Sequence, residues 1–196
     1  MKEVLGANPC PIAIPIGAEE QFKGIVDLVT MKAFVYDDSA NPTEYTIQDI
    51  PAEVAEDAAQ WRENLLEKAA DFDEDLMMKV LEDPDSITEE ELRAAIRKGT
   101  LALELTPMTC GSSFKNKGVQ PLLDYVCAYL PSPLDIEAVT GMNPKTDEEE
   151  SRQPIESDKT SALVFKIATN PFVGRLIYIR VYSGKVGSGS YISDSR

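Results

Sequence analysis

The sequence predicts a mixed protein of the α+β or α/β class: a small sheet with amphipathic helices, then a strand–loop–helix unit, then an antiparallel β-sheet. Three observations support this prediction. Apolar residues alternate within the first 36 residues, helical periodicity dominates residues 51–98, and β-branched and aromatic residues fill two runs after residue 161. A chain of 196 residues is also long enough to bury at least one core.

Composition limits both the compartment and the chemistry. No run approaches the roughly 18 apolar residues of a membrane span, and no apolar stretch with a cleavage site follows Met1. Cys10, Cys110 and Cys127 are scattered along the chain, which indicates reduced thiols. Histidine, a common metal ligand and general base, is absent. We therefore expect a soluble, cytoplasmic protein with no metal site in this chain.

The negative charge is concentrated in one segment. The chain has a net charge of −15, whereas residues 37–91 alone contain 19 acidic and 3 basic residues, and the remainder is nearly neutral. Such a field repels phosphate backbones and argues against nucleic-acid binding by this segment. Charge alone leaves two interpretations open: a solvated helical face, or a docking surface for a basic partner.

The first half of the chain reads as strands followed by helices. Ile12, Ile14 and Ile16 alternate, and strands are expected at 24–29, 33–36 and 44–47, with a turn at 37–42. Pro51 then opens a long helix, followed by a helix over 73–82 and a third that begins at a capping box and runs to Lys98. The predicted buried stripe of the long helix consists of Val54, Ala58, Trp61, Leu65, Ala69 and Phe72.

The second half of the chain has a different pattern of residues. A strand at 105–110 leads through the loop 111–118 into a helix at 119–130. Residues 134–160 are polar and interrupted by proline, which predicts a linker or long loop. Two long strands follow at 162–168 and 175–182, with the start of a third, forming an antiparallel sheet without a covering layer.

Three patterns are candidates for nucleotide contact. The glycine-rich run 184–189 is flanked by strands and predicts a hairpin turn, while Asn116–Lys117 lacks the carboxylate of a guanine-reading Asn-Lys-x-Asp, since Val119 stands there. The loop 111–118 is the better candidate. It lies between a strand and a helix, where α/β sheets present loops to ligands, and its small residues let backbone N–H groups approach a base.

Three long motifs carry a family resemblance. The stretch 111–120, continuing through 122–124 and 129–133, resembles the fifth guanine-nucleotide motif and following helix of bacterial translation elongation factor G. Residues 15–28 resemble the start of the insert subdomain in that family's GTPase domain, and residues 165–175 and 180–184 resemble the start of its second domain, a β-barrel. The three motifs occur in the family's order and cover nearly the whole chain.

The resemblance implies a domain division and a set of site residues. It implies the tail of a GTPase-domain helix (1–8), an insert subdomain (9–104), the C-terminal part of the GTPase domain (105–133), a linker (134–160) and the first strands of an incomplete barrel (161–196). Most members have alanine at the position of Ser113. The implied residues are Ser112, Ser113 and Phe114 at guanine; Glu53, Glu56, Asp57 and Glu63 at the ribosomal stalk protein; and Arg175, Arg180 and Lys185 at ribosomal RNA.

The resemblance also implies that the catalytic machinery lies outside this chain. GTP hydrolysis needs a phosphate loop, magnesium ligands and groups that position water, and the chain contains no Gly-x-x-x-x-Gly-Lys-Ser/Thr, Asp-x-x-Gly or Asn-Lys-x-Asp. We therefore expect an internal fragment that is inactive alone and binds no cofactor. Its full-length parent would be a GTPase that uses GTP or GDP and Mg²⁺ on the ribosome in translocation. The barrel strands of the fragment would either self-associate through their unpaired edges or stay poorly packed.

Two alternatives remain open. One is another ribosomal GTPase, such as a release-factor or tetracycline-protection relative. The other is a stand-alone acidic protein-binding module with no enzymatic parent. Residues 15–28 argue against the first, because they match the insert subdomain.

Overall fold

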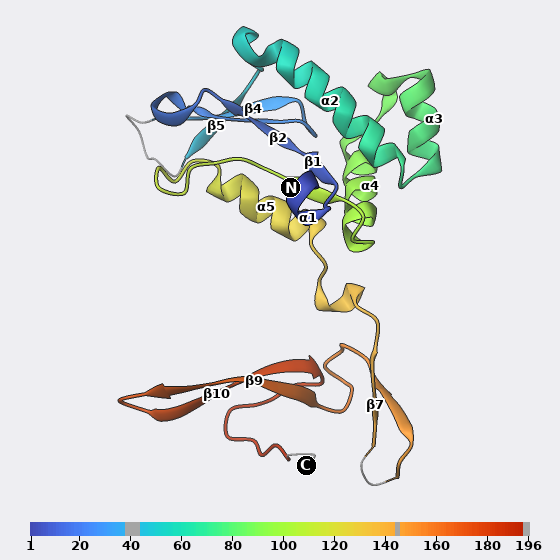
Figure 1. The fold of residues 1–196 in the computed structure, drawn as a ribbon, viewed down its shortest axis with the longest axis vertical. Helices are drawn as coiled ribbons and strands as arrows, with labels where there is room; N and C mark the ends of the chain where they lie inside the picture. Colours follow the sequence, from blue (N-terminus) through green and yellow to red (C-terminus); the bar gives the residue numbers. More distant parts are fainter. Residues whose placement is uncertain (38–43, 144–145, 194–196) are drawn as a thin grey trace. The chain divides into compact units, whose positions relative to one another are not determined.

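The computed structural model describes residues 1–37, 44–143 and 146–193, which form two compact units, Met1–Leu130 and Pro131–Arg196 (Figure 1). The turn predicted at 37–42 lies, from residue 38 onward, outside the described residues. Within the described ranges no helix is long and apolar enough to cross a membrane. The predicted mixture of helices and antiparallel sheets is confirmed, and none of the sheets in these ranges closes into a barrel.

The first unit is built on a four-stranded antiparallel sheet. Its strands pair in chain order: β2 (Ala13–Ile16), β3 (Gly24–Asp27), β4 (Lys32–Tyr36) and β5 (Tyr45–Gln48). All four residues of β3 are buried, as expected for an inner strand. The predicted strand at 24–29 ends early because the Asp27 carboxylate accepts hydrogen bonds from the N–H groups of Val29 (2.7 Å) and Thr30 (3.2 Å), which turns the chain.

A second, parallel pair joins the two ends of this unit. β1 (Pro9–Pro11) pairs in parallel with β6 (Thr106–Met108), so the predicted strand at 105–110 is shorter than expected. The alternating run around Ile12 is divided between the two sheets. Ile12 donates its N–H to the Met108 carbonyl (2.8 Å) and accepts at its own carbonyl from Leu28 (3.0 Å), so one residue links both sheets.

The predicted helices are present. α2 (Ala55–Ala70), α3 (Glu74–Glu82), α4 (Glu89–Leu101) and α5 (Val119–Tyr129) are the long ones, and α1 (Lys2–Leu5) is a single turn. Short 3-10 turns occupy η1 (Glu19–Gln21), η2 (Ala52–Val54), η3 (Pro84–Ser86) and η4 (Pro133–Asp135). The capping box of α4 is confirmed: Thr88 Oγ1 accepts from the Glu91 N–H (3.3 Å), and the Glu91 carboxylate accepts from the Thr88 N–H (3.0 Å).

The core of this unit lies between the sheet and the helices. Leu65, Leu92 and Ile96 are fully buried against Val26 and Leu28. Of the stripe predicted for α2, Ala58, Leu65 and Ala69 are buried, and Val54 and Phe72 are partly buried against the core. Trp61 was wrongly placed on that stripe: it is 41% exposed. Leu66 and Ala70 point inward instead, so the buried stripe is rotated away from the tryptophan.

The second unit contains two hairpins. β7 (Val139–Met142) pairs with β8 (Glu149–Arg152), and β9 (Ser161–Asn170) pairs with β10 (Gly174–Ser183). Residues 134–160, which were expected to form a linker or long loop, therefore contain a hairpin of their own. Neither of its two strands has a buried residue, and they pair through the backbone, so they leave no apolar alternation in the sequence. The predicted start of a third strand was wrong: up to residue 193, no strand follows β10.

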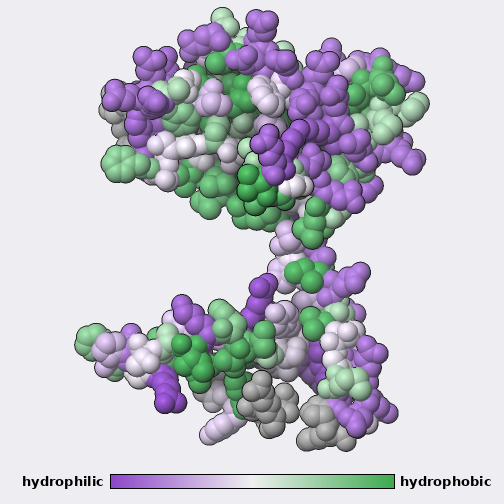
Figure 2. Space-filling model, in the orientation of Figure 1, coloured by the Kyte–Doolittle hydropathy of each residue, from purple (hydrophilic) through white to green (hydrophobic). Residues whose placement is uncertain are grey.

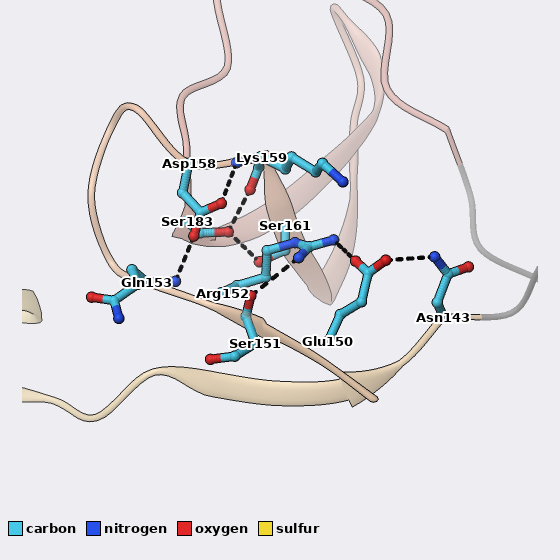
Figure 3. A network of polar contacts seen from close by, with 9 residues as sticks. All are labelled: Asn143, Glu150, Ser151, Arg152, Gln153, Asp158, Lys159, Ser161 and Ser183. Atoms are coloured by element: carbon cyan, nitrogen blue, oxygen red, sulfur yellow. Dashed lines mark hydrogen bonds and ion pairs between the residues drawn. The ribbon is translucent and has the colours of Figure 1, made fainter. Parts of the chain in front are cut away.

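A polar network ties the stretch after β8 to the end of β10 (Figure 3). The Asp158 carboxylate accepts from the N–H groups of Gln153 (2.7 Å) and Lys159 (2.6 Å). Ser183 Oγ donates to the Lys159 carbonyl (2.7 Å), and the Gly184 N–H donates to the Ile155 carbonyl (3.0 Å). This part of the predicted linker is therefore fixed to the β9–β10 hairpin.

Candidate functional site

The candidate loop is a tight turn between β6 and α5. Ser112 and Lys117 form a two-bond antiparallel bridge, with N···O distances of 2.8 and 3.0 Å, which closes the turn at 113–116. Inside it, the Asn116 N–H donates to the Ser113 carbonyl (3.2 Å), and the Lys115 N–H donates to Ser112 Oγ (3.4 Å). Hydrogen bonds within the loop therefore hold it in one conformation.

Glycine is required at the C-terminal end of the loop. Gly118 has φ +84° and forms the N-cap of α5, and a Cβ there would lie 3.0 Å from the Cys110 carbonyl oxygen and the Gly111 Cα. A side chain would therefore clash with backbone and strain a left-handed conformation. This close approach brings the two ends of the loop together.

The tip of the loop faces solvent. The side chain of Phe114 is 99% exposed, and Ser113 is exposed beside it. Among the described residues, no hydrogen-bond acceptor takes the N–H of Ser113 or that of Phe114. Two adjacent backbone donors are therefore available to an external acceptor, such as a carbonyl oxygen.

Two lysines fasten the loop to a distant part of the chain. Lys115 Nζ donates to the carbonyls of Glu19 and Glu20, both at 3.3 Å, and the buried Lys117 Nζ donates to the carbonyl of Phe22 (3.1 Å). Neither residue was among the sequence-predicted site residues. No signal in the sequence could have identified them, because lysines in surface loops are ordinary and their partners lie about 95 residues away.

Helix α5, which follows the loop, is held at both ends. The Tyr36 hydroxyl donates to the Gln120 side chain (3.1 Å) in its first turn, and Arg97 of α4 donates to the carbonyls of Ala128 (2.9 Å) and Leu130 (3.1 Å) at its last turn. Tyr125 in the middle of the helix and Tyr129 at its last residue are buried in the core. The scaffold behind the loop is therefore fixed.

The predicted docking acids lie at the start of α2 and along its outer face. Glu53 is in η2, with its carboxylate 3.9 Å from Lys23 Nζ, and Glu56, Asp57 and Glu63 are exposed on α2. Glu56 and Glu63 are seven residues apart and therefore share one face of the helix, whereas Asp57 is rotated to its side. Hydrophilic side chains cover much of the visible surface over α2 (Figure 2).

The predicted basic residues lie in the second unit. Arg175 and Arg180 are exposed on β10, and Lys185 is exposed just after it. The Arg180 guanidinium lies 5.7 Å from the centre of the Tyr182 ring, a cation–π arrangement. The structure thus leaves all three cations accessible in one hairpin.

Other reactive groups in the described ranges do not form a second site. No cluster of three or more metal-ligating side chains occurs within them. Burial raises the pKa of Cys10 and of Cys110 to about 11, so both thiols stay protonated near neutral pH and are poor nucleophiles.

Comparison with known proteins identifies the family. No family model matches the chain. The whole chain is 51% identical to an elongation factor G of Cytophaga hutchinsonii and 48% identical to one of Amoebophilus asiaticus, and it spans 28% of the length of each of these curated relatives. A Thermus thermophilus protein of known crystal structure matches 96% of the chain with a TM-score of 0.71 and 26% identity, over 25% of its own length. The resemblance predicted from the three motifs is therefore confirmed: all 196 residues of the chain match a part of proteins that are named elongation factor G.

Proposed function

We propose that this chain is an internal part of a translational GTPase, and that the whole protein couples GTP hydrolysis to ribosomal translocation. The observation that carries the proposal is the 51% identity to an elongation factor G along the entire chain. The groups that hold GTP or GDP with Mg²⁺ and position water would belong to the rest of that protein, since the chain has no phosphate-loop motif.

The gene tests this proposal directly. A phosphate-loop motif is expected upstream of the codon for Met1, in the same reading frame. A stop codon in frame between any such motif and Met1 would instead support a stand-alone acidic binding module. The relatives' name and the match to the insert motif at 15–28 both favour the first result.

Within this protein, we assign the guanine contact to the loop at Ser112, Ser113 and Phe114. The support is geometric: two neighbouring N–H groups at the exposed tip have no acceptor among the described residues, and the base carbonyl of guanine would supply one. Because the donors belong to the main chain, Ser113 in place of the family's alanine leaves the contact intact. A hydrogen bond of this kind contributes about 1 kcal/mol.

Titration of the isolated chain with GMP, followed by NMR, tests the assignment. Two backbone bonds predict a dissociation constant no better than about 1 mM, with amide shifts confined to the loop around Ser113 and Phe114. AMP is the control, because it lacks the carbonyl acceptor. Equal shifts with both nucleotides, or none with GMP, would contradict the base contact. Micromolar binding of GTP, or measurable GTPase activity, would contradict the fragment assignment itself.

The domain division 1–8, 9–104, 105–133, 134–160 and 161–196 follows from the same assignment. The insert and the GTPase-domain segment would not be independent bodies. β1 of the first pairs in parallel with β6 of the second, and both lie in the compact unit Met1–Leu130. The barrel assignment follows from the motifs at 165–175 and 180–184 and is supported by the β9–β10 hairpin, which contains them.

We further propose that the acidic face of α2 binds a basic surface of the ribosomal stalk protein. Its support is an exposed row of carboxylates, including Glu56 and Glu63, on a helix whose other face is buried. Reversing both charges (Glu56→Lys with Glu63→Lys) should weaken capture of the stalk protein's C-terminal domain at least fivefold. Glu137→Lys, at an exposed acid of the second unit, is the control. Unchanged capture by the double variant would mean that the acidic face of α2 is only solvated and does not bind the stalk protein.

The cations of the β9–β10 hairpin would face ribosomal RNA. Arg175, Arg180 and Lys185 are exposed there, and phosphate neutralisation by three cations predicts a shallower salt dependence when all three are replaced by alanine. RNA affinity measured across salt concentrations checks this. An unchanged slope would assign these residues to edge protection of the strands.

A further inference from the structure

The loop and the η1 turn contact each other through lysine side chains and backbone carbonyls. Lys115 Nζ lies 3.3 Å from the carbonyl oxygens of both Glu19 and Glu20, and Lys117 Nζ lies 3.1 Å from that of Phe22. We propose that Lys115 and Lys117 are positioning residues, which lock the loop 111–118 against the 17–22 turn and so fix the direction of the Ser113 and Phe114 N–H groups. The role assigned to those N–H groups rests on the proposed guanine contact.

The backbone conformation of the 17–22 turn leaves carbonyl groups available to the two lysines. Gly17 has φ +78°, and a Cβ there would lie 2.1 Å from the Gln21 carbonyl oxygen, so only glycine permits this tight return. The three-residue η1 turn ends at Phe22, and no following helical turn supplies N–H groups to the carbonyls of Glu20 and Phe22. A cationic donor is the natural partner for carbonyls at a helical C-terminus.

The turn and the base of the loop also share a small apolar cluster. Phe22 is buried with Ala13, Ile25 and Phe34, and Cys110, directly before the loop, packs partly buried against the same cluster. The turn therefore cannot move away from the loop without opening this packing. Apolar contact fixes the distance, and the two lysines fix the orientation.

Lys117 is the stronger of the two anchors. It is 2% exposed, whereas lysine side chains are almost never fully buried without partners. Withdrawing its ammonium group from the Phe22 carbonyl would cost this buried charge one of its hydrogen bonds and would cost the carbonyl a donor. Because the Lys117 backbone also forms the bridge to Ser112, its anchored side chain holds the closing point of the loop.

Hydrogen exchange in the full 196-residue chain tests the lock without any nucleotide. Lys117→Met should raise the exchange rates of the Ser112 and Lys117 bridge amides at least tenfold, and Lys115→Met should raise them less. Amides in α2 and α4 should keep their rates. Lys98→Met is the matched control, because Lys98 is exposed on α4 and makes no side-chain bond within the described ranges. Unchanged bridge exchange in Lys117→Met would overturn the proposal.

Two further variants separate positioning from general stability. Lys117→Arg keeps a cationic donor and should restore most of the protection. Gly17→Ala changes only the turn, yet it should raise exchange at Ser112, which is far away along the chain. If Lys117→Met does not fold, Lys115→Met and Gly17→Ala still test the proposal. Unchanged protection of the Ser112 and Lys117 bridge amides in both variants would overturn the positioning role of the lysines.

A GMP titration separates this proposal from the guanine assignment. The loop amide shifts of the parent chain should weaken three- to tenfold in apparent affinity in Lys117→Met and recover in Lys117→Arg. If the parent chain responds to GMP no more than to AMP, the guanine assignment fails, while the exchange results still decide whether the lysines position the loop. If the parent chain responds and Lys117→Met responds equally, the positioning role is overturned.

Discussion

Asp27 is the buried carboxylate at which β3 ends. It is 2% exposed and accepts hydrogen bonds from the N–H groups of Val29 and Thr30. Desolvation raises its pKa above 3.8, against the opposing effect of these two bonds. The turn needs the acceptor oxygen of this side chain, whereas its negative charge carries a cost.

Replacing Asp27 with asparagine should therefore preserve or raise stability at neutral pH. Because the folded-state pKa lies above the unfolded value of 3.8, the parent loses stability as pH rises from about 3.8 through the folded pKa. The asparagine variant lacks this loss, so its stability should rise relative to that of the parent between pH 4 and pH 7. Urea denaturation at the two pH values checks this.

Asp27→Ala is the contrasting variant. It removes the acceptor for two N–H groups and should cost about 2 kcal/mol at pH 4. The cost should be smaller at pH 7, because the alanine variant also lacks the charge that destabilises the parent there. A loss of the same size in the asparagine variant at pH 7 would mean that the charge itself stabilises the turn.

At the residue scale, the sequence predicted where the candidate loop lies but not what holds it. Small residues between an apolar strand and a helix mark the loop at 111–118, and the structure closes it through Ser112 and Lys117. The lysine contacts could not be predicted, because their acceptors are backbone carbonyls of a distant turn. A carbonyl has no residue-type signature, so only the fold reveals such a partner.

Helix α4 shows how an element is fixed at its first turn. Thr88 and Glu91 form the capping box, and Lys79 of α3 bonds the same Glu91 carboxylate at 2.5 Å. These contacts lower the pKa of Glu91 to about 2, with the bond from Lys79 as the largest cause. One exposed carboxylate thus joins the cap to the neighbouring helix.

The capping box predicts an acid-dependent contribution to stability. A lowered folded pKa stabilises the protein above the unfolded value near 4.5, and this contribution is lost as pH falls toward 2. Thermal midpoints between pH 5 and pH 2.5 should therefore fall less steeply in Glu91→Gln than in the parent. Glu90→Gln, the adjacent acid in the same turn, is the control and should follow the parent. Matching slopes in all three proteins would contradict the prediction.

The two faces of α2 should respond differently to truncation. Leu65 is fully buried, so Leu65→Ala should cost about 3 kcal/mol through lost burial and a cavity. Trp61 is 41% exposed, so Trp61→Ala should cost about 1 kcal/mol despite its larger side chain. Urea denaturation of both variants checks the order. Equal losses of stability in the two variants would mean that Trp61 belongs to the buried stripe predicted from periodicity.

At the element scale, helices were the most predictable part. Their caps and three- to four-residue periodicity are local, which is why the long helix, the Thr88 cap and α5 all occur where expected. The β7–β8 hairpin was missed because none of its strand residues is buried, so no apolar alternation marks it, and its pairing is a property of the backbone. The division of the Ile12 run between two sheets was missed because it depends on the distant Met108.

At the scale of the whole molecule, the hydrophobic core is confined to one unit. Among the described residues, every buried hydrophobic side chain lies within Met1–Leu130. In the second unit, Leu163, Phe165, Ile167 and Ile177 are all more than half exposed, and hydrophobic side chains lie open along β9 and β10 in Figure 2. A two-stranded hairpin without a covering layer is at best marginally stable in water.

Cutting the chain after Leu130 should therefore leave the main thermal transition almost unchanged. Calorimetry of residues 1–130 should reproduce the midpoint of the full chain within a few degrees, because none of the buried apolar side chains of the described ranges is removed.

In the full chain, the β9–β10 amides should exchange rapidly at low concentration. As concentration rises, light scattering should detect pairs that form through the exposed strand edges, and the same amides should become protected. The 1–130 chain is the control and should stay monomeric. A full chain that is monomeric at high concentration, yet protects its β9–β10 amides, would show that the hairpin is stable by itself.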